Sequence, residues 1–291
     1  MFRKSSKPYG YEMPLNLAQL GYKLDEVGRV VLIENGEPYK YEVKKDDKIF
    51  NEALYIALLD TLAIEVERRL LDAGLQKIRL PTVEPGLDDP DAPHTKFFMS
   101  KNAMASPEKL MLIIPTQSVH AAVWSNRIMV NDGIDRGSIV GYVHRAIKEG
   151  YEVIVFNPSE IYWLVGGKRV VPKIDERRWK KSIPIPENES PEEHCVNVVD
   201  KFVRKSNAKN IFIVAHAWGA TLAVDMLNRE MEYFYPLTRA VALINPACRP
   251  TELELDYNVI HVESSEASEV PDQVIYLEED RIFKYFEEKT G

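Results

Sequence analysis

Short, almost uninterrupted apolar runs, each followed by a helical stretch, constrain this sequence most. Val153–Phe156 and Ile211–Val214 contain apolar residues only. Such runs suit strands buried on both faces, and strands of that kind separated by helices form a parallel sheet covered on both sides. The sequence therefore predicts an α/β fold, with strands at 76–80, 110–114, 151–156, 210–214 and 238–244 and helices at 138–149, 191–205, 218–232 and 279–289.

A small β unit and one long helix are expected before this sheet. The runs Gly28–Ile33 and Tyr39–Val43 flank an Asn-Gly turn signal, which predicts a hairpin. A helix is expected over 49–73, because its leucines and valine fall four residues apart and form one apolar stripe. We expect a flexible N-terminus at 1–14 and a single domain at 15–291.

Composition and net charge argue against several classes of function. The chain has 291 residues, a net charge of −8 and two cysteines. The acidic balance argues against direct nucleic-acid binding, and so few cysteines favour a reducing, intracellular compartment. The longest apolar runs, such as Leu110–Ile114, are too short to cross a bilayer, so no membrane partner is expected. Neither phosphate-binding glycine motif occurs, and no cofactor or metal is expected.

Charge is unevenly distributed along the chain. The segment 157–190 reads as a long irregular insertion, and its stretch Lys168–Lys181 carries a net charge of +5. It could be a localisation signal, an RNA-contacting loop or an exposed insertion. The segment 251–280 contains ten acidic residues and neither Lys nor Arg. We expect a partner to bind the insertion together with this acidic block, and the candidate contact residues are Trp163, Arg177, Arg178, Trp179, Lys180 and Lys181.

The stretch from 211 to 227 has the setting of a nucleophile elbow. A buried strand is followed by Ala215-His216-Ala217-Trp218-Gly219 and then by a helix. In α/β-hydrolases, G-x-S-x-G places a serine nucleophile on such a turn. The nucleophile position here is Ala217, whose methyl group can neither attack a carbonyl nor share a proton with a base.

The other parts of a serine-hydrolase site are also altered. The next strand ends at Asn245, where a carboxylate would be expected, and the region of the late histidine reads around Pro271. Pro115 stands in the oxyanion loop and has no N–H to donate. One such loss could be an engineered change, but several independent losses point to a natural pseudoenzyme.

Three further side chains are candidates for a chemical or packing role. Cys248 follows a strand and could be a substitute nucleophile, although no base is assigned to it. His194, on a helix capped by Ser190, is expected at the surface or an interface. His216 could be a relic or a metal ligand, but we expect it to pack locally.

Five short stretches, in this order, resemble the Argonaute-binding protein 2 domain family, whose animal members are called cotranscriptional regulators. The resemblance runs from Leu15 to Phe286. It is carried by Phe97–Ser100, Gly150–Pro158, Ser190–His194, Val214–Gly219 and Ile282–Phe286.

This resemblance implies an α/β-hydrolase-like fold with a mostly parallel sheet flanked by helices on both faces. It also implies a role as a subunit or adaptor in Argonaute and small-RNA-guided silencing, heterochromatin assembly or cotranscriptional regulation. The implied partners are an Argonaute protein or another silencing-complex subunit, with chromatin and splicing proteins as further candidates. The implied location is the nucleus, with the cytoplasm as a second compartment. The alternative is a residual hydrolase or small-ligand binder that uses the old pocket.

Overall fold

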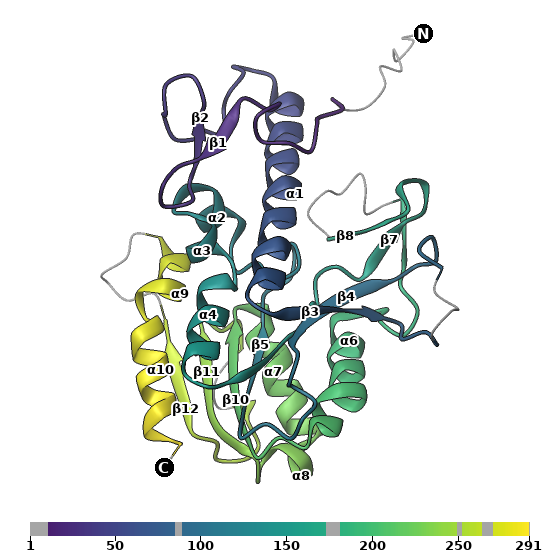
Figure 1. The fold of residues 1–291 in the computed structure, drawn as a ribbon, viewed down its shortest axis with the longest axis vertical. Coiled ribbons are helices and arrows are strands. Elements are labelled where there is room, and N and C mark those ends of the chain that lie inside the picture. Colours follow the sequence, from purple (N-terminus) through teal and green to yellow (C-terminus); the bar gives the residue numbers. More distant parts are fainter. Residues whose placement is uncertain (1–10, 85–88, 173–180, 249–251, 264–269, 291) are drawn as a thin grey trace.

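The computed structural model describes residues 11–84, 89–172, 181–248, 252–263 and 270–290 (Figure 1). Within them, seven strands form the central sheet, in the order β12-β11-β10-β5-β6-β4-β3. The strands are β3 (Leu75–Leu80), β4 (Thr95–Ser100), β5 (Lys109–Ile114), β6 (Glu152–Val155), β10 (Asn210–His216), β11 (Thr238–Ile244) and β12 (Val259–Val262).

The sheet is mostly parallel, as the apolar runs predict. The strands β12, β11, β10, β5 and β6 pair in parallel, whereas β4 runs antiparallel to both β6 and β3. All five expected strands are present. The strands β4 and β12 were not expected. β12 extends the sheet beyond β11 at one edge, and β4 adds an antiparallel strand between β6 and β3.

Helices cover both faces of the sheet. One apolar cluster joins a face of the sheet to α1, α4 and α10, and the other joins the opposite face to α6 and α7. Residues of β5 alternate between the clusters, since Met111 belongs to the first and Leu112 to the second. The helices are α1 (Lys48–Asp72), α2 (Asn126–Asn131), α3 (Ile134–Gly137), α4 (Val140–Lys148), α6 (Pro191–Val198), α7 (Trp218–Arg229), α8 (Met231–Phe234), α9 (Val274–Leu277) and α10 (Glu279–Glu288). This is the α/β-hydrolase-like architecture expected from the sequence.

The long helix α1 forms where the apolar stripe predicts it. Leu58, Leu62 and Leu70 are each 0 % exposed. The side chain of Asp47 caps the helix by accepting a hydrogen bond from the Phe50 N–H at 3.0 Å. No helix among the described residues is both long enough and apolar enough to cross a membrane.

The strand pairing predicted for the N-terminal hairpin is wrong. β2 (Val30–Leu32) pairs with β1 (Tyr22–Leu24), not with 39–43. The chain does turn back after β2, but only one bridge, Val31 to Pro38, forms there. Pro38 has no N–H to extend the ladder, and Tyr39 is buried against the Tyr22 ring instead.

The insertion 157–190 is less irregular than expected. Within its described part, β7 (Tyr162–Leu164) pairs antiparallel with β8 (Arg169–Val171) and with β9 (Ser182–Pro184). These strands were missed because each has three residues, too few for a visible alternation. They form because Trp163, Val171 and Ile185 are buried, at 3 %, 3 % and 0 % exposed. In Figure 1 this small sheet lies beside β3 and β4.

Candidate functional site

The turn between β10 and α7 keeps the backbone of a nucleophile elbow. Ala217 has φ 51° and ψ −115°, a combination that L residues rarely adopt. Its N–H donates to the Ile244 carbonyl at 2.9 Å, and its carbonyl accepts from the Ala247 N–H at 3.3 Å. The strained conformation is therefore held by the neighbouring strand end, although the side chain at its apex is a methyl group.

Close approach of strand and helix explains the glycine of this turn. A Cβ at Gly219 would lie 2.3 Å from the Ile114 carbonyl oxygen and 2.5 Å from that of Pro115. Both contacts are with backbone, which cannot move aside as a flexible side chain could. The end of β5 and the start of α7 thus fit together only with glycine at this position.

The structure brings the three altered positions together. Asn245 follows β11, and its amide Nδ2 donates to the Pro271 carbonyl at 2.8 Å. Because Ala217 and Ala247 are joined by a backbone hydrogen bond, the elbow lies beside this pair. The amide side chain of Asn245 carries no charge, so it cannot stabilise an imidazolium as a carboxylate does.

His216 is a packed side chain, as expected, and it is neutral at pH 7. It is 3 % exposed, and its ring meets the edge of Trp124 with the centroids 6.0 Å apart. Burial lowers its pKa to about 4, against the opposing charge of Asp272. Within the described residues, neither ring nitrogen has a hydrogen-bond partner.

Cys248 lacks the environment of an activated thiol. Burial raises its pKa above the ordinary value, so it is protonated at neutral pH. Among the described residues, no group of three or more His, Cys, Asp or Glu side chains is arranged to hold a metal ion.

The surface position expected for His194 is wrong. The side chain is 0 % exposed, and burial lowers its pKa to about 3. Its Nε2 accepts from the Asn157 N–H at 2.9 Å, and its Nδ1–H donates to Asn188 Oδ1 at 2.9 Å. One neutral imidazole thus joins the two ends of the insertion to α6.

Of the six proposed partner-contact residues, the structure describes two, Trp163 and Lys181. Trp163 is buried and packs on His94, with ring centroids 4.8 Å apart, so it lines a cavity and is not exposed on the outer surface. Lys181 is exposed. Four of the candidates, Arg177, Arg178, Trp179 and Lys180, lie outside the described residues.

The acidic block does not lie beside the insertion. Its β12 is one edge of the sheet, whereas the insertion joins β4 near the other edge, where Thr95 Oγ1 donates to the Glu160 carbonyl at 2.6 Å. Figure 1 shows the two regions on opposite sides of the molecule. The described parts of the two regions therefore do not form one continuous surface, and residues 173–180 and 264–269 lie outside the described residues. Part of the block is also paired internally, since Asp280 accepts from Arg145 at 2.5 Å.

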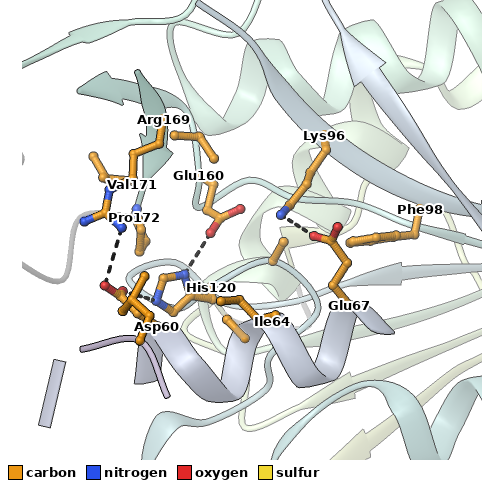
Figure 2. A pocket seen from close by; sticks show the side chains of 14 residues that line it. Asp60, Ile64, Glu67, Lys96, Phe98, His120, Glu160, Arg169, Val171 and Pro172 are labelled. Atoms are coloured by element: carbon orange, nitrogen blue, oxygen red, sulfur yellow. Dashed lines mark hydrogen bonds and ion pairs between the residues drawn. The ribbon is translucent and has the colours of Figure 1, made fainter. Parts of the chain in front are cut away.

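The structure contains a buried group of charged side chains that was not predicted from the sequence. His120 lies between two carboxylates, with its Nδ1 2.8 Å from Glu160 Oε1 and its Nε2 3.0 Å from Asp60 Oδ1 (Figure 2). All three side chains are buried. Arg169 reaches Asp60 at 3.7 Å, and Lys96 lies close enough to Glu160 to influence its ionisation. We call these five side chains the charged cluster.

His120 and Glu160 are both ionised at neutral pH. Burial alone would lower the pKa of His120, but its hydrogen bonds to Asp60 and Glu160 outweigh burial and raise the pKa to about 9. Burial would likewise raise the pKa of Glu160, but Lys96 and His120 lower it to about 2. The members come from α1, β4, β8 and the loops after β5 and β6, so the cluster ties the insertion to the carboxyl edge of the sheet.

Comparison with known proteins identifies the family of this chain. The model of the Arb2 domain family matches residues 13–258. The cotranscriptional regulator ARB2A homolog of Xenopus tropicalis is 31 % identical over 272 residues, which are 80 % of this chain and 63 % of that protein. Human cotranscriptional regulator ARB2A is 29 % identical over 281 residues, covering 84 % of this chain and 66 % of that protein. The chain thus spans slightly less than two thirds of the length of these relatives.

One solved structure with a partly similar fold is that of the histone deacetylase Clr3. It is 13 % identical, with a TM-score of 0.48, over 80 % of this chain and 39 % of that chain. The family match, by contrast, covers most of the sequence, from the N-terminal hairpin through β11. The chain belongs to the Arb2 domain family.

Proposed function

We propose that this chain is a non-catalytic, α/β-hydrolase-like protein-interaction module. In this proposal it acts in the nucleus as a subunit or adaptor in Argonaute-dependent, small-RNA-guided silencing and heterochromatin assembly, or in cotranscriptional regulation. Its relatives carry the name cotranscriptional regulator, which supports a regulatory role. The cytoplasm is a second location to examine.

The observation that carries the non-catalytic part is Ala217 at the apex of an intact elbow. The strained backbone is kept and the nucleophile is missing. Asn245 and Pro271 occupy the neighbouring positions, where the Asn245 amide donates to the Pro271 carbonyl. A fold that retains the turn without its chemistry is better suited to binding than to turnover.

A small-ligand binder at the old pocket is the second candidate function. Trp218 is 57 % exposed beside Ala217, so it does not fill the space above the elbow. An exposed tryptophan is also a residue type that commonly anchors a protein partner. The elbow and the insertion are therefore the two surfaces to separate by experiment.

Affinity purification with mass spectrometry tests the partner assignment. The tagged chain is compared with Arg178→Ala/Trp179→Ala and with Trp218→Ala, each checked for an unchanged melting temperature. We expect an Argonaute protein or another silencing-complex subunit to be enriched with the parent chain and lost with the insertion variant. Loss with Trp218→Ala alone would place the partner at the elbow, and no enrichment of such subunits would contradict the silencing role.

A further inference from the structure

A cavity of about 420 Å³ lies between the small sheet of the insertion and the β3–β4 edge of the central sheet. This volume falls within the range of small-ligand pockets, roughly 300–1,000 Å³. Its walls come from β3, β4, the segment before β4 and the β7–β8 hairpin. It adjoins a smaller cavity of about 220 Å³, shown in Figure 2, and the two share Lys96, Arg169 and Val170.

Basic side chains dominate the wall of the larger cavity. Five of its described lining residues are Lys or Arg, and none is Asp or Glu; the basic residues are Lys77, Arg79, Lys96, Lys168 and Arg169. They converge from three separate segments of the chain. Such convergence is the arrangement that recognises an anion carrying several oxygens.

Carboxylates outside the wall hold these cations in place. Glu67 accepts from Lys77 at 2.6 Å and from Lys96 at 2.5 Å, and Asp91 pairs with Lys168. Glu67 lines the smaller cavity instead, together with Asp60 and Glu160. Asp60, Glu67 and Glu160 therefore gather at the smaller cavity, whereas the larger cavity is lined by five cations and has Asp91 beside Lys168, so an anion is favoured in the larger cavity.

The remaining wall is apolar and aromatic. The His94 and Trp163 rings pack together there, and Pro90 and Val170 also line the cavity. A bare phosphate would leave this part of the wall uncovered. We propose that the larger cavity binds a phosphorylated small molecule, with its phosphate on the basic wall and its organic part against His94 and Trp163. This site is independent of the partner assignment and of the elbow.

Calorimetric titration of the full chain with ADP, inorganic pyrophosphate and adenosine tests this site. We expect ADP and pyrophosphate to bind, ADP the more tightly, and adenosine not to bind at millimolar concentration. Lys77→Gln and Lys168→Gln should each weaken ADP binding about 10-fold or more, because each removes a charged hydrogen-bond donor. Lys168→Arg should restore the affinity, since it restores the charge.

Lys209→Gln is the matched control. Lys209 is 64 % exposed and pairs with Glu108 at 2.7 Å, much as the 62 % exposed Lys168 pairs with Asp91. Lys209 does not line the larger cavity, so Lys209→Gln should leave the affinity for ADP unchanged. The proposal is overturned if ADP and pyrophosphate fail to bind at millimolar concentration. It is also overturned if Lys77→Gln and Lys168→Gln bind ADP as Lys209→Gln does.

Discussion

Replacing His120 with glutamine removes the positive charge between Asp60 and Glu160. The pKa of this imidazole rises from its ordinary value of 6.5 to about 9 in the fold, which corresponds to about 3 kcal/mol of stabilisation by its charge. Removing one partner of a buried ion pair costs about 3–5 kcal/mol, because the other charge is left uncompensated. We therefore expect His120→Gln to lose about 3–5 kcal/mol of unfolding free energy near pH 6.

The pH dependence of the unfolding free energy tests this prediction most specifically. Because the pKa of His120 is higher in the folded than in the unfolded state, the stabilisation is complete below about pH 6.5 and is lost as the pH rises through about 9. The parent chain should lose about 3 kcal/mol across that window. His120→Gln should show little change there, since it has no proton to release.

Urea unfolding followed by circular dichroism at several pH values measures both effects. His144→Gln is the control, because His144 is exposed on α4 and its replacement should change stability by about 0.5 kcal/mol or less. A parent chain whose stability is flat between pH 6.5 and 9 would refute the charged state of His120. So would a His120→Gln variant with the same slope as the parent.

Three further predictions concern the elbow and the insertion. Gly219→Ala should lose about 1–3 kcal/mol or more in urea unfolding, because its Cβ would meet two backbone oxygens, whereas Gly166→Ala, with open space around it, should not. The pKa of His194 falls to about 3 on folding, so stability should decline as the pH drops from 6.5 towards 3, and less so in His194→Gln. Cys248 should react with iodoacetamide at pH 7 more slowly than glutathione does, as followed by mass spectrometry, because burial raises its pKa; faster reaction would show an activated thiol.

The central sheet could be predicted because its strands are recognisable one at a time. Ile211–Ala215 of β10 and Val153–Val155 of β6 are apolar throughout, and such runs indicate burial on both faces without knowledge of neighbouring strands. β12 was not predicted because it has only four residues and lies within the acidic block, whose charged residues are typical of a solvated surface segment. The three-residue strands of the insertion form only when they meet, so nothing within any one of them indicates the sheet.

The elbow could be predicted for a similar reason, since Ala215 to Gly219 lie together in the sequence. The charged cluster could not, because Asp60, His120 and Glu160 are each separated by at least 40 residues and meet only through folding. One signal was available: Asp60 interrupts an apolar stretch of α1 and is buried there at 8 % exposed. His194 was misjudged because its hydrogen-bond partners, at the two ends of the insertion, are visible only in three dimensions.

Labelling of the purified chain with a fluorophosphonate probe, together with turnover of small esters, tests the absence of serine-hydrolase chemistry most directly. We predict neither labelling nor turnover for the parent chain. Ala217→Ser should also remain inactive, because Asn245 cannot orient a histidine as a carboxylate does, and losing that orienting charge costs roughly 10⁴ in rate. Labelling of the parent chain at one defined residue, or ester turnover that a single substitution abolishes, would contradict the account.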